Sequence, residues 1–235
     1  MKINKQSNVY TIIYIIVLVV VVGAALAFTS ISLRERQQAN AAADKMSQIL
    51  ASIDIHPSAD SIAAAYSTYV TGSFAVDSRG NRIEGVDAFD VDVTAQSKLP
   101  VEQRILPVYQ CRLADGDVKY VLPMSGTGLW GPIWGYISVD ADGTTVYGAY
   151  FAHQGETPGL GAEIEKPRFS AQFTGKKLFD SGDIFVPIAV VKGGSDTVAN
   201  PHAVDGISGG TITSKGVGAM IDNCLTPYSL FLKSL

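Results

Sequence analysis

Cysteine and histidine are scarce in this sequence, which has two of the first and three of the second in 235 residues. Cys111 and Cys224 stand far apart, no CxxC pair occurs, and no histidine has a second ligand at metal spacing. Structural zinc and iron–sulfur centres need several such ligands close together, so the chain is not expected to hold a metal. The two cysteines could form one disulfide outside the cytoplasm, but two buried thiols are the favoured interpretation.

Charged residues are also few, at 17% of the chain, and they leave a net charge of −4. A surface that binds nucleic acid needs an excess of positive charge, so no nucleic acid is expected as a partner. The GxxxxGK[ST] spacing of a Walker loop is absent, and no dinucleotide fingerprint of a βαβ unit is recognised. We therefore expect no NADH binding by this chain alone.

One long apolar run is present, from Val9 to Phe28, and it contains no charged residue. As a helix it would be about 30 Å long, which is the thickness of a bilayer core. A cleaved signal peptide is the alternative, because Ala25-Leu26-Ala27 has the form of a cleavage site. The run is longer than the usual signal core, so an uncleaved single transmembrane helix over 9–29 is favoured. The lysines and arginines on its two sides do not decide its orientation.

The remainder predicts an α+β fold, with a helical stalk at 30–56 and a folded domain at 57–235. Three β-hairpins are predicted because paired strand patterns bracket Asp/Asn/Gly turns: 74–77 with 83–85, 108–113 with 118–124, and 133–139 with 145–152. Together they indicate an antiparallel meander with helices at both ends. Later in the chain we expect a further strand at 184–191 and a last short helix that Thr226 caps and that runs to Leu235.

The stretch from Asp205 to Thr213 places three glycines and three hydroxyls in nine residues, directly before a predicted helix. The helix is predicted because apolar residues follow at helical spacing and can pack on a core: Val217, Met220, Ile221, Cys224 and Tyr228. Glycines let the backbone approach a ligand closely, and a helix start offers free N–H groups to a phosphate. The stretch therefore predicts a phosphate-holding turn, although a plain loop is the common alternative. Gly206–Gly210 also fits the GxSxG nucleophile elbow, but all three histidines precede Ser208, so a serine hydrolase is disfavoured.

Two segments resemble FMN-binding domains. Asp205-Gly206-Ile207-Ser208-Gly209-Gly210-Thr211 is similar to their flavinylation motif D-G-x-[ST]-G-[AS]-T, from which only Gly210 departs. His153–Gly161 is similar to their H-x-x-E-T-P-G-L-G segment. The resemblance implies that Thr211 carries FMN through a phosphoester, and that Asp205, Ser208, Gly209 and Gly210 shape the turn around the phosphate. It also implies flavin contacts from the second segment and from a flat apolar wall, with the residues Glu156, Thr157, Leu160, Gly161 and Trp130.

The Gly128-Leu129-Trp130 segment and the N-terminal anchor resemble the C-type subunits of the sodium-translocating NADH:quinone oxidoreductases. The resemblance implies an electron-transfer subunit on the periplasmic side of the inner membrane, with FMN as its cofactor. It also implies that residues 1–8 are a short N-terminal segment on the cytoplasmic side. The subunit has no catalytic residues of its own; its partners are the other subunits, and a flavin transferase during maturation. The equivalent G-type subunit of Rnf complexes is the alternative, but it usually lacks the tryptophan. A non-redox anchor without flavin is a further alternative.

Overall fold

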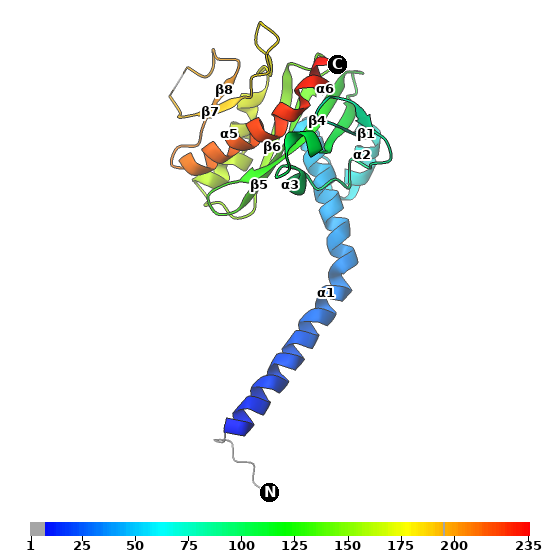
Figure 1. Cartoon of the computed structure of the whole chain (residues 1–235), viewed down its shortest axis with the longest axis vertical. Helices are drawn as coiled ribbons and strands as arrows, with labels where there is room; N and C mark the ends of the chain where they lie inside the picture. Colours follow the sequence, from blue (N-terminus) through cyan, green and yellow to red (C-terminus); the bar gives the residue numbers. More distant parts are fainter. Residues whose placement is uncertain (1–7, 195) are drawn as a thin grey trace. The chain divides into compact units, whose positions relative to one another are not determined.

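The computed structural model describes residues 8–194 and 196–235, and the chain divides into the units Met1–Lys45 and Met46–Leu235 (Figure 1). Helix α1 (Asn8–Ser52) contains the predicted span at 9–29 and continues through most of the predicted stalk at 30–56. Of the described helices, it alone is long and apolar enough to cross a membrane. Its apolar side chains in the predicted span are exposed, as a lipid-facing helix requires. Apart from Asn8, the predicted N-terminal segment 1–8 lies outside the described residues.

A six-stranded antiparallel sheet forms the centre of the second unit, in the order β2-β1-β3-β4-β5-β6. The three predicted hairpins are confirmed, since β1 pairs with β2, β3 with β4, and β5 with β6. Strand β4 also pairs with β5, so β3 to β6 form the predicted meander. The first hairpin departs from it, because β3 pairs with β1 rather than with β2, which leaves β2 at the edge of the sheet. The strands are β1 Val70–Val76, β2 Arg82–Ile83, β3 Leu106–Arg112, β4 Val118–Thr127, β5 Pro132–Asp140 and β6 Val146–His153.

Each of these hairpin turns combines an aspartate with a glycine at positive φ. In the β5–β6 turn, Asp142 Oδ1 accepts hydrogen bonds of 2.8 Å from the N–H groups of Thr144 and Thr145. Gly143 has a φ of 66°, and a Cβ there would overlap the carbonyl oxygen of Leu232. The turn therefore needs glycine both for its backbone conformation and for space.

Gly126 near the end of β4, with Gly128 and Gly131 in the β4–β5 turn, gives the GxGxxG spacing. Here the glycines connect two antiparallel strands, and Gly128 N donates to Gly131 O at 2.8 Å. A dinucleotide fingerprint instead joins a strand to a helix within a βαβ unit. These glycines thus serve a tight turn, and the spacing does not mark a nucleotide site.

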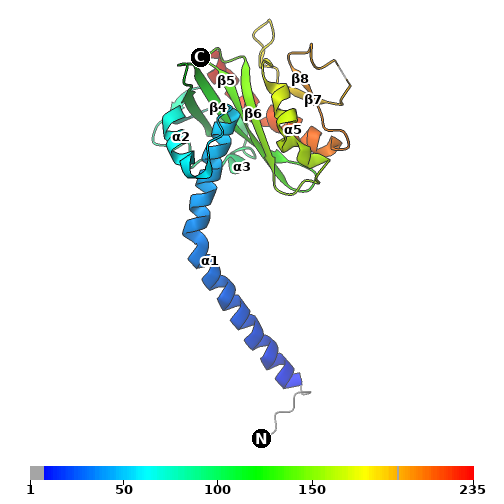
Figure 2. The same ribbon diagram turned by 180° about the vertical axis from the view of Figure 1, so that it is seen from behind.

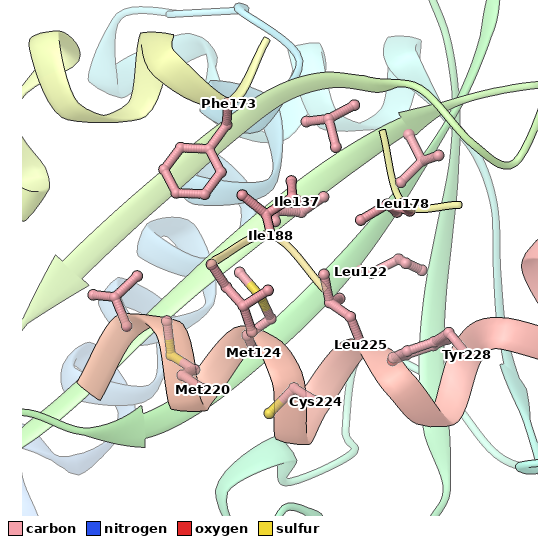
Figure 3. Close-up of a cluster of buried hydrophobic side chains, with 14 of the residues drawn as sticks. Leu122, Met124, Ile137, Phe173, Leu178, Ile188, Met220, Cys224, Leu225 and Tyr228 are labelled. Carbon is pink, nitrogen blue, oxygen red and sulfur yellow. The ribbon is translucent and has the colours of Figure 1, made fainter. Parts of the chain in front are cut away.

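Helix α5 (Thr211–Leu225) packs its apolar face on one side of the sheet (Figure 3). Val217, Met220, Ile221 and Cys224 are buried there at the helical spacing that the sequence shows. The Met124 side chain lies against this helix in Figure 3, and Phe173 and Ile188 close the same core from the other side. The core thereby fixes the position of the first turn of α5, where Thr211 stands.

The end of α1, from Met46, and helix α2 (Ile62–Tyr69) cover the other face of the sheet (Figure 2). Ser138 Oγ donates to Ser52 O at 2.6 Å, and Trp134 Nε1 donates to Gln48 Oε1 at 3.0 Å. These bonds join the end of α1 to strand β5. Trp134 consequently has a structural partner on this face.

Two expectations about the later chain are corrected. The predicted strand at 184–191 is formed only as β7 (Ala189–Val191), because Asp180 Oδ1 holds a turn by accepting from the N–H groups of Gly182 and Ile184. Strand β7 pairs in parallel with β8 (Ala203–Asp205), which no local sequence pattern indicated. The predicted final helix is a 3-10 turn followed by α6 (Ser229–Lys233). Thr226 does not cap this segment, because its hydroxyl bonds to Asp222 of α5.

The remaining helices are short. Helix α3 (Val93–Gln96) precedes β3, and its N-cap is Asp92, whose carboxylate accepts the N–H of Ala95 at 3.0 Å. Helix α4 (Pro167–Ser170) follows the loop after β6 and buries Phe169 against Phe151 and Phe173, with ring centroids 5.3 and 5.5 Å apart.

Both cysteines are free and buried, as expected. Burial raises the pKa of Cys111 to about 12, and burial also raises the pKa of Cys224, whose Sγ lies 3.3 Å from Ser125 O. Neither thiol therefore forms a reactive thiolate at neutral pH. The two side chains belong to the opposite faces of the sheet.

Close approach between α5 and β4 depends on Gly216. A Cβ at this position would overlap the carbonyl oxygen of Thr127, whereas a Cβ at Gly218 would lie 3.6 Å from Val190 N, an ordinary contact. We expect Gly216→Ala to lower the free energy of unfolding by about 1–3 kcal/mol through overpacking. Gly218→Ala in the same helix should raise it by up to ~1 kcal/mol, because alanine favours helix. Urea unfolding of both variants measures the difference, and equal effects would contradict the close approach.

Candidate functional site

The segment 205–210 forms a tight turn between β8 and α5. Gly206 N donates to Val191 O at 2.7 Å, and Ile207 N donates to Ser214 Oγ at 2.8 Å. Gly209 has a φ of 76°, and Gly210 N donates to Ile207 O at 3.0 Å just before the helix begins. The turn is held by its own hydrogen bonds, as the glycine pattern predicts.

The three hydroxyls of the motif have different surroundings. Thr211 is the first residue of α5 and is exposed, and Ser208 is exposed in the turn. Thr213 is only 1% exposed, and its Oγ1 donates to Glu156 Oε2 at 2.5 Å. Ser208 and Thr211 are thus open to a modifying group, whereas Thr213 is engaged inside the protein.

A groove of about 560 Å³ lies beside the exposed hydroxyls. The first turn of α5 and the motif turn form one side, with Thr211, Ser208 and Lys215. Strand β7 and the residues after it form the other side, with Val191 and Lys192. Among the described residues that line the groove, the charged ones are Lys192 and Lys215, and none is an aspartate or glutamate. Such a groove offers an apolar wall and positive charge to an anionic ligand.

A second groove, of about 640 Å³, shares the motif turn with the first. It is lined by Lys166 and Arg168 and by the acidic side chains of Glu163 and Asp205. The Asp205 backbone forms two bonds with Gln172, at 2.9 and 3.2 Å, but its buried Oδ1 has no hydrogen-bond partner in the described part of the chain. The motif turn is therefore accessible from two sides.

Glu156 holds three segments together beneath the motif. Its Oε1 accepts the Trp130 N–H at 2.8 Å, its Oε2 accepts the Thr213 hydroxyl, and Leu129 N–H also bonds to the carboxylate. The side chain is 4% exposed. Burial by itself would raise the pKa of Glu156, but these hydrogen bonds outweigh it and hold the pKa below its usual value. The buried carboxylate is therefore charged at neutral pH.

The Glu156 carboxylate has room only because two of the residues that surround it are glycines. A Cβ at Gly161 would overlap the Thr213 hydroxyl and approach Glu156 Oε2 at 2.5 Å. A Cβ at Gly128 would lie 2.6 Å from Glu156 Oε1. These two glycines, in the loop after β6 and the β4–β5 turn, allow the contact between their loops and α5.

Several large apolar side chains remain exposed around this cluster. Trp130 is 69% exposed and Leu160 is 42% exposed. A Cβ at Gly209 would approach Leu160 Cδ2 at 2.6 Å, so this leucine lies against the motif turn. Ile212, beside Thr211, is 57% exposed. The site thus has an apolar border.

His153 and Thr157 complete the loop after β6. His153 Nδ1 accepts the Glu156 N–H at 3.1 Å, so this histidine is hydrogen-bonded within the loop. Its Nε2 lies 3.5 Å from Glu165 Oε2. Thr157 is exposed, and its carbonyl accepts from the N–H groups of Leu160 and Ala162 at 3.1 Å. The loop is ordered by its own bonds and leaves the Thr157 hydroxyl on the surface.

The structure thus brings the predicted site residues from three segments to one end of α5. Glu156 and Gly161 pack beneath that end, and Trp130, Leu160 and Thr157 are exposed. Sequence reasoning missed Val191 and Lys192, because only the parallel pairing of β7 with β8 places them beside the motif. It also missed Lys215, which the helical spacing of i and i+4 from Thr211 could have identified.

Comparison with known proteins agrees with this geometry. Residues 128–226 match the FMN-binding domain family. The C-type subunit of the Na(+)-translocating NADH-quinone reductase of Vibrio anguillarum is 36% identical over 93% of this chain and 91% of its own length. The crystal structure of the same subunit from Parabacteroides distasonis has a TM-score of 0.79 at 49% identity, covering 86% of this chain and 98% of its own. The crystal structure of Shewanella oneidensis NqrC has a TM-score of 0.68 at 25% identity, covering 82% of this chain and 96% of its own.

Fold and site together define an FMN-binding domain that follows an apolar N-terminal helix. The chain belongs to the NqrC family, the C-type subunits of the Na(+)-translocating NADH-quinone reductases. The crystal structures confirm the predicted fold class, and the relatives favour this family over the Rnf-type alternative.

Proposed function

We propose that this chain is the electron-transfer subunit that carries FMN covalently on Thr211, in a membrane complex that couples NADH oxidation and quinone reduction to Na⁺ translocation. The observation that carries the proposal is the placement of Thr211. This exposed residue is the first of α5 and lines a groove whose charged residues, among those that the structure describes, are all cationic. A phosphate needs a reactive oxygen, free helical N–H groups and positive charge, and these residues supply all three.

The attachment is written as a transfer from FAD. Thr211 Oγ forms a bond to the flavin-side phosphorus, the bond from that phosphorus to AMP breaks, and AMP leaves. A flavin transferase with its metal ion takes up the hydroxyl proton and activates the phosphoanhydride. The product is a phosphodiester with one negative charge. Among the motif hydroxyls, Thr211 is favoured over Thr213 because the latter is buried and bonded to Glu156.

Once FMN is bound, it supplies electron transfer, and the protein supplies its position and surroundings. Ser208, Gly209 and Gly210 shape the turn beside the phosphate, and Asp205 begins it. Glu156 and Gly161 hold the loops and the start of α5 in one arrangement. The exposed side chains of Thr157, Leu160 and Trp130 are proposed to contact the isoalloxazine ring.

The proposed location is the bacterial inner membrane, with α1 as a single span and the domain on the periplasmic side. Its partners are the other subunits of the complex and the transferase during maturation. NADH and quinone bind to those other subunits. No bond between Ser208 and a histidine occurs in the described residues, and His202 Nδ1 instead bonds to Lys177 O at 2.8 Å, so a serine hydrolase has no support here.

Intact mass spectrometry of the full chain tests the proposal. The protein is produced with and without a flavin transferase and analysed after denaturation. We expect a mass gain equal to FMN less water, with flavin fluorescence that survives a denaturing gel, only when the transferase is present. Release of the flavin on denaturation would show that it binds without a covalent bond. A colourless protein would support the non-redox anchor.

A further inference from the structure

The groove beside Thr211 contains a lysine to which neither the flavinylation motif nor the comparisons give a role. Lys215 lies four residues after Thr211, so both side chains project from the same face of α5 and line the same groove. Lys215 is exposed, and no hydrogen bond or ion pair of its ammonium group is formed with the described residues, in contrast to Lys119 and Lys166.

The charge of the groove differs from that of the whole chain. The chain carries more acidic than basic residues, at 22 against 18. The described residues that line the groove instead include Lys192 and Lys215 and no Asp or Glu. An exposed lysine on a helix is commonly only a solubilising residue. Here, Lys215 and Lys192 line the groove beside the exposed Thr211, and among the described lining residues no carboxylate offsets their charge, which favours an anion.

We infer that Lys215 is the cationic partner of the phosphoryl group on Thr211, a positioning residue both during the transfer and in the finished phosphodiester. This inference rests on the proposed function. Lys215 neutralises the negative charge that the groove receives when Thr211 Oγ takes the flavin phosphate from FAD. An ammonium on a flexible stem suits this task, because it follows the phosphate from the transfer to the finished ester.

The rate of flavinylation of the purified full chain in detergent tests the inference, with purified transferase, FAD and Mg²⁺ and with intact mass as the readout. Lys215→Gln should slow the reaction about twofold to fivefold, the value of an exposed ion pair. Lys215→Glu should slow it about tenfold or more, and Lys215→Arg should stay close to the parent. The differences should shrink as salt is raised to about 0.5 M, where exposed charges are screened.

Lys98 provides the matched control. Its neighbour Ser97 accepts a bond of 3.0 Å from Asn223 Nδ2, near the end of α5 opposite to Thr211. Lys98→Gln and Lys98→Glu make the same charge changes there and should leave the rate unchanged. Thermal unfolding of all variants should coincide with that of the parent, because Lys215 holds no other residue among those the structure describes.

A ³¹P NMR spectrum of the flavinylated product separates contact with the phosphate from contact with the transferase. We expect the phosphodiester resonance of the Lys215→Gln product to shift from the parent position, and that of Lys98→Gln to stay. A slowed reaction without such a shift would assign Lys215 to transferase binding and overturn the inference, as would an unchanged rate for Lys215→Glu. If the parent itself gains no FMN, the proposed function fails instead.

Discussion

Thr211→Ala is expected to abolish the covalent flavin completely, leaving a mass and a colourless denaturing gel like those of protein made without transferase. The variant removes the proposed acceptor oxygen, on the exposed first residue of α5. Its stability should stay within ~0.5 kcal/mol of the parent, because the threonine side chain is at the surface. Loss of flavin will then reflect lost chemistry rather than lost folding.

Two further variants sharpen this result. Thr211→Ser keeps a hydroxyl at the same position and should keep some flavinylation. Ser208→Ala removes the other exposed hydroxyl of the motif and should still give a flavinylated protein. A flavin that survives in Thr211→Ala but disappears in Ser208→Ala would move the attachment to Ser208.

Glu156→Leu should cause the largest loss of stability around the site, about 3 kcal/mol or more. The leucine fills the space but leaves the N–H groups of Trp130 and Leu129 and the Thr213 hydroxyl without their acceptor. Each buried unsatisfied donor costs about 1–3 kcal/mol. Urea unfolding measures the loss. Glu163→Leu is the control, because Glu163 accepts a single bond of 3.1 Å from Gly159 and should cost less than ~1 kcal/mol.

Glu156→Gln separates hydrogen bonding from charge. The amide oxygen can accept both backbone N–H groups, and the amide nitrogen can donate to the hydroxyl of Thr213, so most of the stability lost in Glu156→Leu should return. A Glu156→Gln protein as unstable as Glu156→Leu would show that the charge, and not the bonding pattern, stabilises the site.

The stability of the parent and that of Glu156→Gln should depend differently on pH, because the pKa of Glu156 is lowered in the folded protein. The unfolded chain takes up its proton near the ordinary glutamate pKa of about 4.3, and the folded chain does so at a lower pH. The carboxylate thus adds stability above about 4.3 that is lost as the pH falls through the folded pKa. Parent stability should drop relative to Glu156→Gln over that acidic range, and parallel curves would contradict the assignment.

Local signals in the sequence predicted much of the fold. The three hairpins were found because their turns combine aspartate with glycine, and Gly143 shows how strongly such a turn is determined by backbone conformation and space. The face of α5 was found from helical spacing. The prediction of a strand at 184–191 was mostly wrong, because apolar composition does not show that Asp180 forms a turn there. The parallel β7–β8 pair depends on a long-range contact that no local pattern encodes.

The part of the site that lies within a sequence motif could be predicted, whereas the part that depends on contacts between distant segments could not. Residues 205–211 could be located in advance as the turn before α5. The burial of Glu156 could not, since it depends on a turn 26 residues earlier and a helix 57 residues later in the chain. The resemblance implies that Glu156 contacts the flavin, but both of its carboxylate oxygens accept hydrogen bonds from protein donors. Direct contact between Glu156 and flavin stays a prediction.

Fragmentation mass spectrometry of the flavinylated parent would locate the flavin on a single residue. Cleavage after Lys192 and Lys215 releases the peptide 193–215, which holds the whole motif. We predict one peptide that has gained FMN less water, with every fragment ion that carries the gain containing Thr211. A gain located on Ser208, Thr213 or a residue outside this peptide would contradict covalent attachment at Thr211.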